Sequence, residues 1–479
     1  MTAPAARERS EVVPVKRPYT VVRSAWSIAA THPVAVPFAV ALTARVIAAI
    51  GIDKFQHGYL FPDESDYVNF GRLASTGHLT VSVEGGYGED LFHEAASFMW
   101  PLTVLFRLFG THILVAALWA ALFGAVTAVL TAVLVRFATN SNGWAVVAGL
   151  AVALFPSQIL WSSVVLRESM VWAGLAGTAI GVTMFSRAKQ WQYLVGATVV
   201  TGVSLLSLAY LRYWAFIPAA WAAAAAVWLF RPARPIFARG LCLLLCLFIP
   251  VLPGLGIAGS TYVAHGGSDL GYERTVLSEG AKSAFVHPKV IAARPGTKPS
   301  AATNPSAATN PSATTLPSAI PSAIADEELV VPKGLRNDLK ALPRGLLAFA
   351  LRPFPWQHGD GLSYDFAALE EVLYYPLYVL AAVGLVASRR RRDVIAFPLL
   401  AVALITGIAS EAEGNLGSAF RHRDQLLWAL VLLATLGTRA ILENWRERRA
   451  EAGTPHDQVR DEGLALVQPF MRSVAQQCQ

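Results

Sequence analysis

Apolar blocks of about 17 to 25 residues recur along this chain, separated by short polar or basic connections. A helix of that length crosses the hydrocarbon core of a bilayer, which is about 30 Å thick. Hydrophobic residues make up 54% of the 479 positions and charged residues only 15%, whereas soluble domains carry about 25% charged residues. The sequence therefore predicts an all-α integral membrane protein and excludes a purely soluble fold.

Ten of the blocks are predicted to be transmembrane helices, near 34–52, 112–136, 144–161, 169–186, 193–210, 213–230, 240–262, 367–387, 394–410 and 424–442. They divide the chain into an N-terminal tail (1–33), seven helices (34–262), an outer loop (263–366), three helices (367–442) and a C-terminal tail (443–479). Phe98–Phe109 is apolar but too short to span, as is Leu342–Trp356, which is expected to be a surface helix that breaks at Pro353 and Pro355.

Basic residues in the short connections predict the orientation. With ten spans they all fall on one side of the membrane, namely Arg187 and Lys189, Arg231, Arg234 and Arg239, Arg389 to Arg392, and Arg439, Arg446, Arg448 and Arg449. The positive-inside rule assigns that side, with both termini, to the cytoplasm of a multi-pass plasma-membrane protein. The formal charge of +7 is thus explained by membrane topology, and nucleic acid is not an expected partner.

Two large loops then face outward, at residues 53–111 and 263–366. The second contains a low-complexity stretch, 301–325, with two AATNPS repeats in succession. Such a sequence cannot bury enough apolar surface to fold, so a disordered or extended insert is expected.

The first outer loop opens with three acids in four residues, in the stretch FPDESDYVNFGRL. Asp63, Glu64 and Asp66 follow the first span closely. A carboxylate partly shielded by apolar neighbours can take a proton from an attacking hydroxyl. Carboxylates can also hold a hard divalent cation such as Mg²⁺ or Mn²⁺. A merely solvated acidic loop is the alternative interpretation.

Arginines on the outer side oppose the positive-inside rule and call for a reason. Arg421, His422 and Arg423 precede the last span. A guanidinium matches the geometry of phosphate oxygens, and lipid phosphates lie at this depth. Alternatively, these arginines pair with neighbouring acids such as Glu411, Glu413 or Asp424.

Other candidate ligands to a lipid substrate lie in separate outer turns. Arg167 precedes Glu168 and could instead form a local ion pair with it. Arg212 stands among aromatic residues and could instead anchor its helix in the aromatic belt of the membrane. Arg352 and Trp356 could instead be interfacial anchors. Arg45 lies deep within the first span and is expected to face the bundle interior, toward a buried acid or a lipid phosphate.

The Asp63–Glu64 pair, followed by Tyr67 and a helix-like continuation, resembles the acidic signature of the GT-C superfamily, membrane glycosyltransferases that use polyprenyl-phosphate-linked sugars. The many spans and the two large outer loops are similar too. The resemblance implies that a first-loop acid is the catalytic base, at the positions of Asp63 and Glu64.

The expected function is transfer of a hexosyl or pentosyl group from a polyprenyl-phosphate donor to a glycan, lipid or protein acceptor at the outer face of the membrane. Asp63 or Glu64 would deprotonate the acceptor. The departing phosphate would be neutralised by Arg421 and Arg423, with Arg212. Asp66 would orient the base or help hold a cation. The alternatives are a polymerase or ligase acting on polyprenyl-pyrophosphate glycans and a non-enzymatic transporter of lipid-linked sugars.

Overall fold

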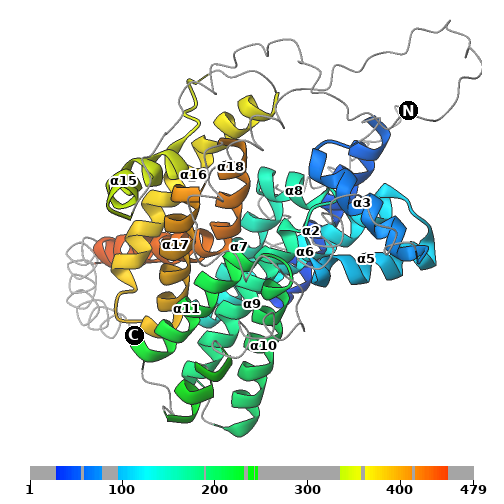
Figure 1. The fold of residues 1–479 in the computed structure, drawn as a ribbon. Helices are drawn as coiled ribbons and strands as arrows, with labels where there is room; N and C mark the ends of the chain where they lie inside the picture. Colours follow the sequence, from blue (N-terminus) through cyan, green and yellow to red (C-terminus); the bar gives the residue numbers. More distant parts are fainter. Residues whose placement is uncertain are drawn as a thin grey trace, which may run out of the picture.

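The computed structural model describes residues 29–55, 59–77, 95–187, 190–230, 236–241, 243–245, 335–357, 362–412 and 416–450. Most of the predicted span at 240–262, the 301–325 insert and most of both tails lie outside these residues. All regular secondary structure in the described ranges is helical (Figure 1). The prediction of an all-α membrane protein is confirmed at this level.

Within the described residues, seven helices are long and apolar enough to cross a membrane. They are α2 (Ala35–Phe55), α6 (Ile113–Thr139), α9 (Glu168–Arg187), α10 (Trp191–Ala209), a span Asp365–Ala387 within α16 (Leu362–Ala387), a span Arg392–Ser410 within α17 (Arg392–Ala412), and a C-terminal helix, Phe420–Ala450. The C-terminal helix includes the second half of α18 (Leu416–Arg423) and the 3-10 turn η1 (Asp424–Leu426). Helix α11 (Tyr213–Leu229) is apolar but has only 17 residues. The predicted number of ten spans therefore stays a prediction.

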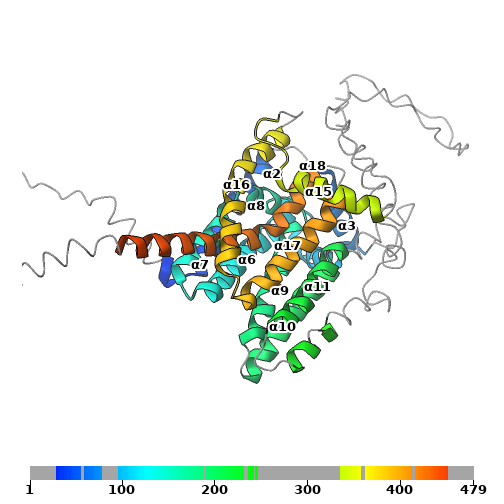
Figure 2. The same ribbon diagram turned by 90° about the vertical axis from the view of Figure 1, so that its left-hand side faces the viewer.

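Two shorter helices flank the bundle, where the sequence predicted segments too short to span. Helix α5 (Ala96–Phe109) packs against α3 (Pro62–Ser75) at one side of the molecule. Helix α15 (Leu335–Leu351) lies against α17 and α18 (Figure 2). Helix α15 ends just before Pro353, because a proline disfavours helical backbone in the residue that precedes it.

The predicted span at 144–161 is not one helix. It consists of α7 (Asn142–Leu154) and α8 (Pro156–Ser162), which are bent by 59°. Pro156 has no N–H, so the carbonyl of Val152 loses its helical donor. The N–H of Ser157, which would serve Ala153 in a continuous helix, instead donates to Glu370 Oε1 at 2.8 Å.

Arg45 satisfies the carbonyls that this break exposes. Its Nη1 donates to Ala153 O at 2.9 Å and its Nη2 to Val152 O at 3.5 Å, while Nε donates to Ser162 Oγ at 2.7 Å. Gly124 of α6 leaves the room for this guanidinium, since a Cβ there would collide with Arg45 Nε. The buried arginine of the first span thus meets backbone carbonyls and a hydroxyl rather than an acid or a lipid phosphate.

Replacement of Arg45 by lysine is expected to lower the free energy of unfolding by about 1–3 kcal/mol, because an ammonium group cannot reach both carbonyls and the Ser162 hydroxyl together. Thermal or denaturant unfolding of the protein in detergent measures this loss. Arg136→Lys, at an exposed position of α6, is the matched control and should change stability little. Equal stability of the two variants would contradict this role of Arg45.

Basic residues from three parts of the chain meet at the C-terminus of α6. Arg187 donates to Phe137 O at 2.7 Å, Arg439 donates to Thr139 O at 2.6 Å, and Arg391 donates to Ala138 O. The last carbonyls of a helix lack internal donors and attract cations. The gathering of these three arginines at one end of the bundle agrees with their predicted location on one side of the membrane.

Candidate active site

Several of the sequence-predicted acids and arginines converge from four segments that are distant in the chain. These segments are the first turn of α3, the start of α9, the turn between α10 and α11, and α18. They meet near the start of α9, whereas the arginine cluster at the C-terminus of α6 includes the last residue of α9, Arg187. The candidate site and that cluster therefore lie at opposite ends of α9.

Glu168 is the centre of the site. This carboxylate is completely buried, and its Oε1 lies 2.8 Å from Arg212 Nη2 and 3.1 Å from Arg421 Nε. Arg167 stands beside it and donates from Nη1 to the carbonyl of Leu211 at 2.8 Å, which ties the start of α9 to the turn before α11. Sequence analysis noted Glu168 only as a possible local partner of Arg167, because its partners Arg212 and Arg421 are distant in the chain.

Asp63 faces the same arginines from α3. Its Oδ2 accepts a hydrogen bond from Arg421 Nη1 at 2.8 Å, and half of its side chain is exposed. Arg421 therefore bridges Asp63 and the buried Glu168. Among the described acids of the first loop, Asp63 has both an ion pair with an arginine and a side chain that solvent reaches.

Glu64, the adjacent acid, points in another direction. Its Oε1 accepts the backbone N–H groups of Leu60 and Phe61 at 3.0 and 2.9 Å, and its Oε2 accepts that of Val165 at 3.1 Å. It closes the N-terminus of α3, as a glutamate at the third helical position does in a capping box. Burial raises the pKa of Glu64, and the three N–H donors oppose that rise. These contacts favour a structural role for Glu64 rather than that of the base.

Glu64→Gln is expected to lower the free energy of unfolding by about 1–3 kcal/mol, because an amide nitrogen would replace an oxygen that accepts a buried N–H. Unfolding in detergent measures this effect, and the less buried Asp66→Asn is the matched control. A Glu64→Gln protein that keeps its stability but loses activity would instead identify Glu64 as the base.

Tyr67 and Asp66 complete the α3 side of the site. The Tyr67 ring is buried, with the Arg167 guanidinium 6.0 Å from its centre. Burial raises the pKa of Tyr67 to about 12. Asp66 is less buried, and burial together with the neighbouring charge of Asp63 raises its pKa.

The Tyr67 pKa predicts loss of stability at high pH. An unfolded tyrosine ionises near pH 10, so between about pH 10 and pH 12 the folded state holds one more proton, and unfolding becomes easier as the pH rises. The loss reaches about 3 kcal/mol at the top of this range and is absent below it. Denaturant unfolding of wild type and Tyr67→Phe at about pH 9 and about pH 11 measures it. An identical pH response of the two proteins would contradict the prediction.

Arg423 does not join this site, although only one residue separates it from Arg421. It pairs with Glu371 of α16 and donates to the carbonyls of Ala350 and Arg352 at 3.2 and 2.8 Å. The expectation that Arg421 and Arg423 act together is therefore not supported, because residues two apart on a helix face different directions. Arg423 instead anchors the end of α15.

The remaining predicted residues divide between the two regions. His422 packs against Trp214, with ring centroids 4.6 Å apart, and so lies at the Arg212 side of the candidate site. Arg352 lies beyond the end of α15, and the exposed Trp356 stacks on Phe354. The carbonyl of Arg352 accepts a hydrogen bond from Arg423, and Trp356 meets Phe354.

A divalent cation shared by Asp63, Glu64 and Asp66 stays a prediction. Both oxygens of Glu64 accept backbone N–H groups, so they are not directed at a common point with Asp63 and Asp66. Across the described part of the chain, no three histidine, cysteine, aspartate or glutamate side chains are grouped as metal ligands.

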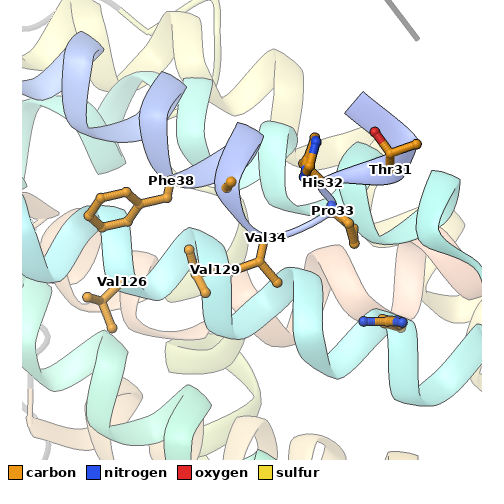
Figure 3. A pocket seen from close by; sticks show the side chains of 9 residues that line it. Thr31, His32, Pro33, Val34, Phe38, Val126 and Val129 are labelled. Carbon is orange, nitrogen blue, oxygen red and sulfur yellow. The ribbon is translucent and has the colours of Figure 1, made fainter. Parts of the chain in front are cut away.

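A groove of about 510 Å³ lies elsewhere, between the start of α2 and α6 (Figure 3). Its lining includes the apolar Phe38, Val126 and Val129 and the basic His32 and Arg136. Arg136 belongs to the last turn of α6, so the groove is at the end of the bundle away from Glu168. It contributes nothing to the candidate site.

Comparisons of the chain with protein-family models, curated proteins and solved structures find no match. The fold defines the chain as a multi-pass α-helical membrane protein.

Proposed function

We propose that this protein is a membrane glycosyltransferase that takes a sugar from a polyprenyl-phosphate donor at the outer face of the plasma membrane, with both termini in the cytoplasm. A transferase working there needs a donor that is already activated, because ATP and nucleotide sugars are cytoplasmic. A lipid-phosphate sugar meets this need. The acceptor is a glycan, lipid or protein hydroxyl.

The observation that carries the proposal is an excess of positive charge around the buried Glu168, beside a solvent-accessible carboxylate. Arg167, Arg212 and Arg421 surround Glu168 and Asp63, which leaves one positive charge uncompensated among these five side chains. Arg212 Nε and Nη1 and Arg167 Nε are buried and have no hydrogen-bond partner. Buried N–H donors without acceptors are costly, and phosphate oxygens would satisfy them with a matching geometry.

The charge of these donors persists at neutral pH. Burial lowers the pKa of Arg212 to about 10, and the negative charge of Glu168 opposes this fall. The guanidinium therefore remains cationic under physiological conditions. It can neutralise the phosphate that leaves during transfer, which is the electrostatic assistance such a reaction requires.

The reaction is then a direct displacement. The acceptor oxygen attacks the anomeric carbon, the bond from that carbon to the phosphate oxygen breaks, and the hydroxyl proton passes to Asp63. Arg421 contacts both Asp63 and Glu168, so it links the base to the arginines that would hold the leaving phosphate. The polyprenyl phosphate departs with the electron pair.

The test is mass spectrometry of polyprenyl-linked sugars and envelope glycans in cells that lack the protein. Accumulation of one monosaccharide-phosphate lipid and loss of one glycan modification, both restored by wild type, are expected. Unchanged lipid-linked sugars would overturn the proposal.

Two other outcomes of the same measurement identify the alternatives. A change in glycan chain length without loss of a sugar type would favour a polymerase or ligase acting on polyprenyl-pyrophosphate glycans. Accumulation of the lipid-linked sugar on the cytoplasmic face alone would favour a transporter. The unpaired arginine donors are compatible with the lipid-linked substrates of all three functions. The solvent-accessible Asp63 is explained best by a transfer reaction, which needs a general base.

A further inference from the structure

A second polar cluster surrounds the break between α7 and α8. Glu370 of α16 accepts the N–H of Ser157 at 2.8 Å, and Asp424 of η1 accepts the hydroxyl of the same serine at 2.7 Å. Glu370 and Asp424 are 2% and 0% exposed, and no role in the proposed transfer reaction uses them. Two carboxylates from separate helices thus contact the same residue, Ser157, at the break between α7 and α8.

Among the described residues, one oxygen atom each of Glu370, Asp424 and Gln158 lacks a hydrogen-bond donor. These atoms are Glu370 Oε2, Asp424 Oδ2 and Gln158 Oε1, all buried. Gln158 is held in place by its Nε2, which donates to the backbone carbonyl of Asp424 at 3.0 Å. Burying an oxygen without a hydrogen-bond donor costs free energy. Such oxygens can bind a proton or coordinate a hard cation.

The charges around the break do not balance. Arg423 pairs with Glu371, and Arg45 binds the carbonyls on the other side of the break. Together with Glu370 and Asp424, these groups amount to three carboxylates against two guanidiniums, a net charge of minus one. The other titratable groups that face Asp424 are the phenols of Tyr374 and Tyr378, which are neutral at physiological pH. A net charge buried in a membrane bundle is unfavourable, and one bound cation removes it.

We propose that Glu370 and Asp424, with Gln158, bind one monovalent cation, a proton or Na⁺, at the break between α7 and α8. Interrupted helices provide polar backbone at membrane depth only where it faces protein or a cavity, and such places suit a small cation. The Ser157 hydroxyl and the Tyr374 hydroxyl both donate to Asp424 Oδ1, which leaves Oδ2 for the cation. Helix α8 begins at this site, and Val165, three residues after its end, donates its N–H to Glu64 Oε2. The proposed cation site is therefore connected through α8 to a residue that positions α3 of the candidate active site.

The test is thermal unfolding of the purified full-length protein in detergent, followed by tryptophan fluorescence, between about pH 5.5 and pH 8.5 in NaCl or in choline chloride. Glu370→Gln and Asp424→Asn remove one negative charge each and should need no cation. Asp365→Asn is the matched control, since Asp365 is an exposed carboxylate on the same helix.

If the cation is a proton, the unfolding constant of wild type and Asp365→Asn should rise with pH, by up to about tenfold per unit, more steeply than that of the two neutralised variants. If the cation is Na⁺, NaCl should stabilise wild type and the control relative to choline chloride above neutral pH, but not the neutralised variants. The proposal is overturned if wild type responds to pH and to Na⁺ no differently from Glu370→Gln and Asp424→Asn.

If both variants fail to fold, measurements on the wild-type protein alone test the proposed cation site. Infrared spectra in choline chloride should then show a protonated carboxyl absorption that shifts in deuterium oxide, or Na⁺ should stabilise the protein. The absence of both effects would overturn the proposal, and neither readout depends on transferase activity.

Discussion

Asp63→Asn is expected to lower kcat for sugar transfer by about 10²–10⁴-fold, the usual contribution of a general base, with little change in stability. An asparagine keeps the size of the side chain and can still accept a hydrogen bond from Arg421, but it cannot take the acceptor proton. The measurement is transfer from a short-chain polyprenyl-phosphate sugar by purified protein, with kcat and KM determined separately.

Asp53→Asn is the matched control, because Asp53 is an exposed acid at the end of α2. Arg421→Lys separates the role of the base from that of the arginine: a weaker phosphate contact should raise KM for the donor as well as lower kcat. The assigned role of Asp63 is wrong if Asp63→Asn keeps the kcat of wild type.

Glu168→Gln is expected to destabilise the protein by about 3–5 kcal/mol. Glu168 is the buried counter-charge for Arg212 and Arg421. Without it, these arginines and Arg167 would repel one another where burial weakens the screening by water. Denaturant unfolding in detergent measures the effect, and this loss should appear whether or not the protein is a transferase.

Asp393→Asn is the control for this experiment. Asp393 pairs with Arg187 at 3.5 Å, and both side chains are about one-third exposed. Ion pairs of this kind contribute about 1 kcal/mol or less. The double variant Glu168→Gln/Arg212→Met should recover part of the stability, because it removes one of the repelling charges. A Glu168→Gln protein as stable as Asp393→Asn would show that the arginines do not depend on this carboxylate.

Several features of the site could not be predicted from the sequence, for identifiable reasons. Asp63 and Glu64 are neighbours with the same chemistry, yet one faces Arg421 and the other binds the N–H of Val165. Arg421 and Arg423 differ in the same way, because two helical positions separate their directions. A sequence reports that these residues are present, but only the helix geometry decides where each points.

The break between α7 and α8 shows the same limit. Pro156 was visible within the predicted span at 144–161, but prolines also occur within helices α16 and α17 without dividing them. The break at Pro156 persists because Arg45 and Glu370, from two other helices, satisfy the backbone groups it exposes. A kink of this kind depends on partners that local sequence does not reveal.

The sequence by itself determined the class of the protein and the grouping of Arg187, Arg391 and Arg439 at one end of the bundle. Hydropathy and charge act locally, within one helix length of the residues concerned, so they can be read along the chain. The tertiary structure decided the pairing of Asp63 with Arg421, which are 358 positions apart, and the burial of Glu168 among three arginines. Contacts between distant segments depend on how the helices pack, and that packing brings the charges of the candidate site together.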